Sequence, residues 1–162
     1  FTHSSVFPAS VEALTAFHNR PDVLRRLTMP PLILQVLRDD RTSLSNGEIE
    51  FRLWFGPIPV HWLAQHMPGP IPTSFKDVQL RGPLARWEHE HLFETDPGGA
   101  KLTDRIIFEH RPGLAGWITR LVFDGLPLRQ LFLYRHWQTR LALRDSSAYS
   151  SAESLHSAKH PF

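Results

Sequence analysis

Residues 114–144 read LAGWITRLVFDGLPLRQLFLYRHWQTRLALR, the only long run with helical periodicity in the chain. At about 100° per residue its apolar side chains gather on one face, which predicts an amphipathic helix lying against the rest of the protein. Gly125 and Pro127 predict a kink or a short break, since Pro127 cannot donate a backbone hydrogen bond. Arg135 falls within the apolar face, where a cation must find a partner or a polar cavity. The predicted apolar face consists of Trp117, Leu121, Leu128, Leu131, Phe132 and Ala142.

The composition is that of an ordinary soluble domain. The 162 residues suffice for one domain with its own core, and 41% of them are hydrophobic. No stretch comes near the ~18 apolar residues that a membrane span requires, and we expect neither a signal peptide nor a membrane span. The absence of cysteine excludes disulfides and thiolate chemistry, and it fits the cytoplasmic location that we expect. A net charge of only +2, with scattered arginines, argues against a nucleic-acid partner.

Upstream of this helix, the pattern predicts a strand, two short helices and then about six strands joined by turns. Turn signals such as Asn46-Gly47 and Gly56-Pro57 separate segments in which apolar and polar residues alternate. Consecutive hairpins imply an antiparallel sheet, and helices segregated from strands imply an α+β fold. We expect the sheet to curve around the long C-terminal helix. The predicted strands are residues 1–7, 32–37, 48–55, 58–66, 74–81, 86–94 and 101–111, and the short helices are residues 8–19 and 21–27.

The last 18 residues, 145–162, read DSSAYSSAESLHSAKHPF and have no apolar period. Their richness in serine and alanine predicts a disordered tail or a linker. We therefore expect a single folded domain over residues 1–144.

Two adjacent strands place polar side chains on faces that should be buried. In residues 86–94, Trp87 and Phe93 bracket His89 and His91 on one face. In the next strand, Asp104 shares a face with large apolar residues. If the hairpin pairs residue 94 with residue 101, Asp104 lies opposite His91 on the same face. With Arg135, the interior then holds a carboxylate, two imidazoles and a guanidinium.

Buried polar groups at this density must pair with one another or meet a ligand. They can form a satisfied network without chemistry, the polar end of an apolar ligand cavity, or an Asp–His acid–base pair. A metal site is a further alternative, because His89-x-His91 puts two imidazoles on one face and Asp104 could be a third ligand. A clear set of three or four ligands is missing, so we predict no metal and no cofactor.

The order of elements resembles the helix-grip fold of the START/Bet v 1-like (SRPBCC) superfamily. Several phrases resemble one bacterial branch of it, described as polyketide cyclase/dehydrase-like or as ligand-binding SRPBCC proteins. These phrases are FHNRPDVLRRLTMPP (residues 17–31), Phe75-x-Asp77-x-Gln79, Gly82-Pro83, Trp87-x-His89-x-His91-x-Phe93, Leu102-Thr103-Asp104-Arg105 and Leu133-Tyr134-Arg135-His136. The resemblance covers nearly all of residues 17–144.

The resemblance implies a cavity between the sheet and the long helix, but it implies no catalytic residues. Similar domains occur alone or ahead of a nucleotide-sugar-epimerase-like domain, so a downstream enzyme domain is a possible partner. The oligomeric state stays open. The cavity residues carried over from the branch pattern are Asp77, Gln79, Trp87, His89, His91, Asp104, Arg135 and His136.

Three functions remain open. We favour a module that binds a hydrophobic or aromatic small molecule, with the helix of residues 21–27 at the mouth of its cavity. The second is a cyclase- or dehydratase-type enzyme, in which Asp104 orients His89 or His91 as a general base and Arg135 stabilises an enolate oxygen. The third is an interaction domain of a larger enzyme, for which we would expect a collapsed cavity and an exposed apolar patch.

Overall fold

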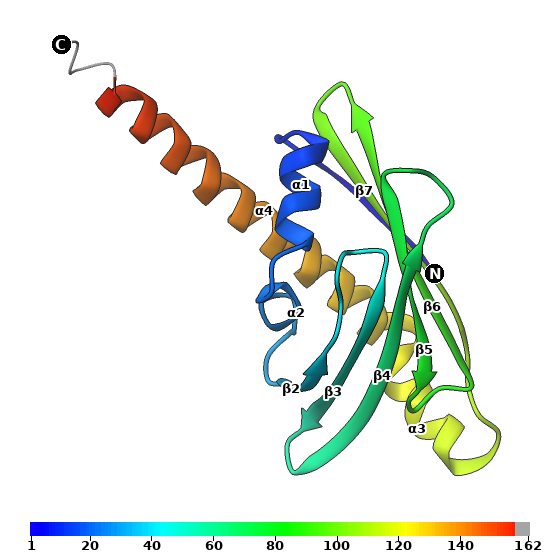
Figure 1. Cartoon of the computed structure of the whole chain (residues 1–162). Helices are drawn as coiled ribbons and strands as arrows, with labels where there is room; N and C mark the ends of the chain where they lie inside the picture. The colour runs from blue at the N-terminus through cyan, green and yellow to red at the C-terminus, as the bar shows by residue number, and fades with distance from the viewer. Residues whose placement is uncertain (158–162) are drawn as a thin grey trace.

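The computed structural model describes the backbone of residues 1–157 and the side chains of residues 1–144. Its centre is one seven-stranded antiparallel sheet with the strand order β1-β7-β6-β5-β4-β3-β2 (Figure 1). The predicted α+β helix-grip architecture is therefore confirmed. The strands are β1 (Thr2–Phe7), β2 (Ile33–Asp39), β3 (Gly47–Phe55), β4 (Ile58–Pro68), β5 (Ser74–Arg81), β6 (Arg86–Asp96) and β7 (Gly99–Glu109).

Within residues 1–157, four helices accompany the sheet. The two predicted short helices follow β1 and are α1 (Val11–His18) and α2 (Val23–Arg26). Ser10 caps α1, since its hydroxyl oxygen accepts the backbone N–H of Ala13 at 3.2 Å. The C-terminal pair consists of α3 (Gly113–Phe123) and α4 (Gly125–Ser157), and α4 crosses the concave face of the curved sheet (Figure 1). None of the described helices is both long and apolar enough to cross a membrane.

The predicted break in the C-terminal helix lies at Asp124, whose extended backbone separates α3 from α4. Gly125 follows with a positive φ of 55°, and Pro127 lies in the first turn of α4, where it needs no intrahelical partner. Because of this turn, residues before and after Asp124 do not share one face. The predicted burial of Trp117 and Leu121 is therefore wrong: these side chains are 69% and 73% exposed.

Beyond the break, Leu128 and Phe132 of α4 are fully buried, as predicted. The helix itself continues to Ser157, into the segment for which we predicted a disordered tail or a linker. Residues 145–157 are thus the last part of α4, whereas residues 158–162 lie outside the described part. The division into a domain over residues 1–144 and a following linker stays a prediction.

The pairing of β6 with β7 fixes the part of the sheet that matters for the site. Glu94 pairs with Lys101, and His91 lies opposite Asp104, as predicted from the turn. The sheet also bends where the register of β4 against β5 shifts between Leu63 and Ala64. Two apolar clusters pack between the sheet and the helices, one around Phe132 of α4 and one around Phe7 of β1.

Candidate functional site

A cavity of about 420 Å³ lies between the concave face of the sheet, the α2 region and the C-terminal helices. Most of the side chains around it are aliphatic or aromatic. Val23, Leu24 and Leu27 contribute from α2 and its end, in the region that we expected at the cavity mouth. The other apolar lining residues come from the segment after α2, from β3 to β6, and from α3 and α4: Met29, Pro31, Leu32, Leu44, Ile49, Phe51, Leu53, Phe55, Trp62, Ala64, Phe75, Trp87, Leu121, Val122, Phe123, Pro127 and Leu131.

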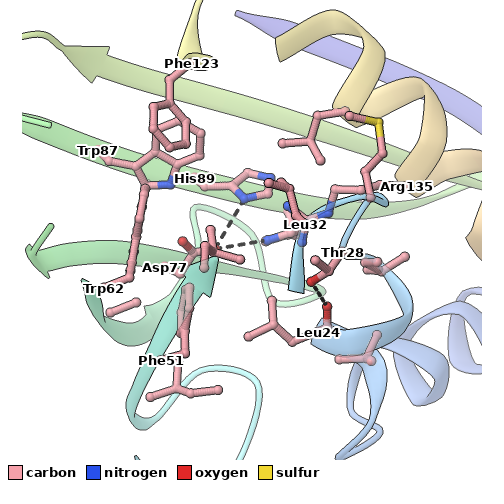
Figure 2. Close-up of a pocket in the computed structure, with 18 of the residues that line it drawn as sticks. Leu24, Thr28, Leu32, Phe51, Trp62, Asp77, Trp87, His89, Phe123 and Arg135 are labelled. Atoms are coloured by element: carbon pink, nitrogen blue, oxygen red, sulfur yellow. Dashed lines mark hydrogen bonds and ion pairs between the residues drawn. The ribbon is translucent and has the colours of Figure 1, made fainter. Parts of the chain in front are cut away.

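One part of this cavity is polar, and four residues predicted from the sequence meet there. Asp77 points into it from β5, His89 from β6 and Arg135 from α4 (Figure 2), and His91 of β6 also lines it. The two histidines are on one face because they are two positions apart on a strand. Asp77 lies beside them because it pairs directly with His89 in the sheet.

The side chain of Asp77 touches both histidines through a single oxygen. Its Oδ2 lies 3.3 Å from His89 Nδ1 and 3.3 Å from His91 Nε2 (Figure 2). The histidine side chains are 2% and 6% exposed, whereas Asp77 retains 19%. Asp77 is therefore the most accessible member of this group.

Asp104 lies behind the two rings, away from the cavity lining. Its Oδ1 accepts a hydrogen bond from His89 Nε2 at 2.7 Å. His91 Nδ1 is 2.9 Å from the same oxygen, at an angle too bent for a good hydrogen bond. His136 of α4 donates from Nε2 to Asp104 Oδ2 at 2.6 Å. Each histidine of β6 thus lies between the carboxylates of Asp77 and Asp104.

The charges of this group shift its pKa values. Burial alone would raise the pKa of Asp77, but His89 and His91 outweigh burial and hold it well below its ordinary value. The same holds for Asp104, whose pKa is depressed by its three histidines despite burial. For His89, burial lowers the pKa, yet the two carboxylates outweigh this and the net shift is upward. Both aspartates are therefore ionised at neutral pH.

Arg135 has no carboxylate partner among the described residues. Its guanidinium carbon lies 5.4 Å from the centre of the Phe132 ring, and the residue is half-buried at the cavity wall. The pairing of Arg135 with Asp104 that a satisfied network would require is absent, because three histidines surround Asp104 instead. The cavity thus has a cation available for a ligand.

The structure separates the other predicted site residues. Trp87 lines the cavity, whereas Asp104 and His136 form the layer behind it. Gln79 is not at the cavity, since its amide donates to the carbonyl of Leu84 at 3.0 Å. Sequence reasoning missed His18, which lines the cavity from the end of α1. Its only signal was its place in the phrase of residues 17–31.

The chain has the helix-grip fold that the resemblance to the START/Bet v 1-like (SRPBCC) superfamily implies. Solved structures of bacterial proteins share this fold, among them an aromatase/cyclase. No protein-family model matches the chain, and a search of curated proteins found no match.

Three solved structures illustrate the similarity. A nucleoside-diphosphate sugar epimerase from Corynebacterium glutamicum is 27% identical with a TM-score of 0.70 over 93% of this chain. The chain spans only 30% of the length of that epimerase chain. Protein CV1439 from Chromobacterium violaceum is 12% identical with a TM-score of 0.65, over 88% of this chain and 95% of its own. The ZhuI aromatase/cyclase from Streptomyces sp. R1128 is 12% identical with a TM-score of 0.57, over 89% and 92%.

Proposed function

We propose that the protein binds a hydrophobic or aromatic small molecule that carries an anionic or carbonyl oxygen. The observation that supports this most directly is the guanidinium of Arg135, which has no carboxylate partner among the described residues and lies at the wall of a largely apolar cavity. A half-buried cation without a counter-ion is costly unless a ligand or water meets it. An oxygen anion of a ligand matches the donor fork of arginine.

The cavity suits a small organic ligand in size and lining. Its volume of about 420 Å³ lies in the range of ~300–1,000 Å³ that is usual for such sites. The aromatic side chains of Phe51, Trp62 and Trp87 lie along one side of it (Figure 2). Apolar contact there gives affinity, and the polar end gives orientation.

Two matched fluorescent probes test the proposal. Anilinonaphthalene sulfonate carries an anion, and N-phenyl-1-naphthylamine is nearly the same molecule without it. We expect both to bind, and we expect Arg135→Met to weaken the sulfonate by about tenfold or more, since a charge-assisted hydrogen bond contributes roughly 1.5–3 kcal/mol. The uncharged probe should change by less than about twofold, because methionine keeps the apolar stem.

A variant with a filled cavity separates this site from the surface. Ala64 lines the cavity and is 3% exposed, so Ala64→Phe should place a ring in it and displace both probes. Leu114→Gln, on the exposed face of α3, serves as the control and should leave both affinities unchanged. Binding that survives Ala64→Phe but disappears in Leu114→Gln would contradict the proposal.

An acid–base enzyme is the second candidate, favoured by one observation. His89 lies within hydrogen-bond reach of Asp104 and also lines the open cavity, as a general base requires. A β-diketone such as benzoylacetone tests this candidate, since a base would accelerate deuterium exchange at its central carbon. We expect a rate increase of about 10²-fold or more, which His89→Gln would remove. Exchange at the buffer rate would exclude this candidate.

One structural feature supports the interaction-domain alternative, and another argues against it. Leu114, Trp117, Ile118 and Leu121 form an exposed apolar strip along α3, here called the α3 patch. This is the surface that an interaction domain would need. The cavity, however, is open rather than collapsed. A similar domain makes up 30% of an epimerase chain, so an enzyme domain is the partner that we would test first on the α3 patch.

A further inference from the structure

The group formed by Asp77, His89 and His91 has the geometry of a metal site. Asp77 Oδ2, His89 Nδ1 and His91 Nε2 all lie within 4.8 Å of one another. The carboxylate oxygen is 3.3 Å from each imidazole nitrogen. Two ligands bound at about 2.0–2.1 Å to a tetrahedral zinc ion lie about 3.3–3.4 Å apart. The three side chains therefore need little movement to meet at one ion.

The second carboxylate supports the same conclusion. Metal-binding histidines usually donate their other ring N–H to a carboxylate, which fixes the tautomer and the orientation of the ring. Here Asp104 Oδ1 lies 2.7 Å from His89 Nε2 and 2.9 Å from His91 Nδ1. The nitrogens that face Asp77 are the remaining ones on both rings. Asp104 is in turn held by His136 at 2.6 Å.

Proton positions give a third argument. Each ring lies between two carboxylate oxygens, and the ring centres are 3.8 Å apart. A neutral ring has a single N–H, so its other nitrogen directs a lone pair at a carboxylate oxygen. A divalent cation between the rings and Asp77 removes this conflict, because the lone pairs of both neutral rings then bind the cation, while Nε2–H of His89 donates to Asp104 and Nδ1–H of His91 faces the same carboxylate.

We propose that Asp77, His89 and His91 bind a divalent transition-metal ion of the zinc class. Two imidazoles and a carboxylate suit such ions, and the two negative charges of Asp77 and Asp104 balance the charge of the metal. Three protein ligands leave a coordination position open, as in catalytic zinc sites. Since all three residues line the cavity, this position would face its interior.

The open position also refines the proposed function, on which this step rests. A carboxylate, phenolate or carbonyl oxygen of the cavity ligand would bind the metal and Arg135 together. Metal binding would also occupy Nδ1 of His89, so this nitrogen could not act as a general base. The metal and the acid–base candidate therefore exclude each other for that atom.

The test uses the full chain without an affinity tag, stripped of metal and titrated with Zn²⁺ by calorimetry and with Co²⁺ by visible absorption. We expect one equivalent of Zn²⁺ to bind at micromolar concentration or tighter, and cobalt to give the strong visible bands of a four-coordinate site. Asp77→Asn should weaken binding by about tenfold or more, and His89→Gln or His91→Gln should abolish it. Asp104→Asn should weaken it by about 10–100-fold.

Two controls account for other histidines. His61, which pairs with Glu50 at 2.7 Å outside the cavity lining, offers a partly buried His–carboxylate pair, so His61→Ala should leave the affinity unchanged. The double variant His156→Ala with His160→Ala removes the two histidines near the end of the chain, and it should also leave the affinity for Zn²⁺ unchanged. Zinc binding that is absent, or that is unaffected by all three ligand variants, would overturn the proposal.

A variant that gains an absorption band distinguishes loss of a metal ligand from loss of folding. Asp77→Cys should keep metal binding and add a thiolate ligand, visible as sulfur-to-cobalt charge-transfer absorption. A purely structural aspartate would give no such band, and its absence in a folded Asp77→Cys protein would also contradict the proposal. Because no cavity ligand is used, failure here is separate from failure of probe binding, which is measured on the metal-free protein.

Discussion

His136 of α4 donates a hydrogen bond to Asp104 of β7 at 2.6 Å, and both side chains are almost completely buried. This bond links the long helix to the sheet directly behind His89 and His91. Asp104 thereby holds three histidines from two different elements. The position of α4 over the cavity and the orientation of the histidine rings depend on the same carboxylate.

Removing that carboxylate should destabilise the whole domain. We expect Asp104→Ala to lower the free energy of unfolding by about 3–5 kcal/mol, because the partners of a buried charged group lose their counter-ion. Asp104→Asn keeps the shape and should cost less. Urea unfolding at pH 7 measures both. The control is Glu94→Gln on the exposed side of β6, for which we expect a change within about 0.5 kcal/mol. Equal losses in Asp104→Ala and Glu94→Gln would contradict this role.

The buried His18 should make stability fall as the pH decreases. Burial, and then the proximity of His91, lower the pKa of His18 from 6.5 to about 3, and its Nδ1 hydrogen-bonds the carbonyl of Leu14 at 2.8 Å. The unfolded chain therefore binds a proton between pH 6.5 and pH 3 that the folded chain does not. The contribution of His18 is complete above pH 6.5 and is lost towards pH 3.

The variant His18→Gln removes this titration. Between pH 7 and pH 5 the free energy of unfolding of the unmodified chain should fall by about 2 kcal/mol more than that of His18→Gln. Chemical denaturation at the two pH values measures the difference. The same fall in both proteins would show that His18 is not kept neutral by the fold. Protonation of Asp77 and Asp104, whose pKa values are depressed, adds to the loss at lower pH.

The histidine site shows which parts of a site can be predicted from sequence periodicity. Strand alternation places His89, His91 and Asp104 on the inner face, and the Asp-Pro-Gly-Gly turn fixes which of them are opposite. Strand alternation and the pairing across a short turn involve residues close together in the chain, so both can be predicted from a single sequence. The position of Asp77 depends instead on the register between β5 and β6, which was not predicted from the sequence of the connecting residues 82–85.

The positions of Gln79 and of the apolar face of α3 depend on tertiary structure, which sequence periodicity does not predict. Gln79 is two positions after Asp77 and should share its face of β5. It lies near the end of the strand, however, and its amide donates a hydrogen bond to the carbonyl of Leu84 across the Gly82-Pro83 turn. The α3 face is as apolar as that of α4, but the extended Asp124 directs it away from the sheet. An apolar stripe predicts which face of a helix can be buried. Whether that face is buried depends on how the chain orients the helix relative to the sheet.

The α3 patch should contribute nothing to the stability of the single chain. Trp117 is 69% exposed, so we expect Trp117→Ser to change the free energy of unfolding by less than about 0.5 kcal/mol. Phe132→Ser, at a ring that is 0% exposed, should cost about 3–5 kcal/mol. Thermal and urea unfolding compare the two. A large loss in Trp117→Ser at low protein concentration would mean that the patch is covered within one chain.

The turn between β6 and β7 is the last determinant of the site, because it sets the register that brings His91 opposite Asp104. Gly99 in this turn has a φ of +125°, and a Cβ there would lie 2.2 Å from the backbone carbonyl oxygen of Phe7. Gly99→Ala must therefore strain the turn and push β1 away. We expect a loss of about 2–4 kcal/mol, since both the backbone conformation and the space forbid a side chain.

Gly56 is the matched control for this prediction. It also has a positive φ, of 60°, but nothing lies within 4 Å of a Cβ placed there. Gly56→Ala should cost only about 1 kcal/mol, which is the conformational part alone. Urea unfolding gives both values, and amide exchange of β1 should rise in Gly99→Ala only. If the two variants lose the same stability, the contact with Phe7 does not constrain the turn, and the register must be set by strand pairing itself.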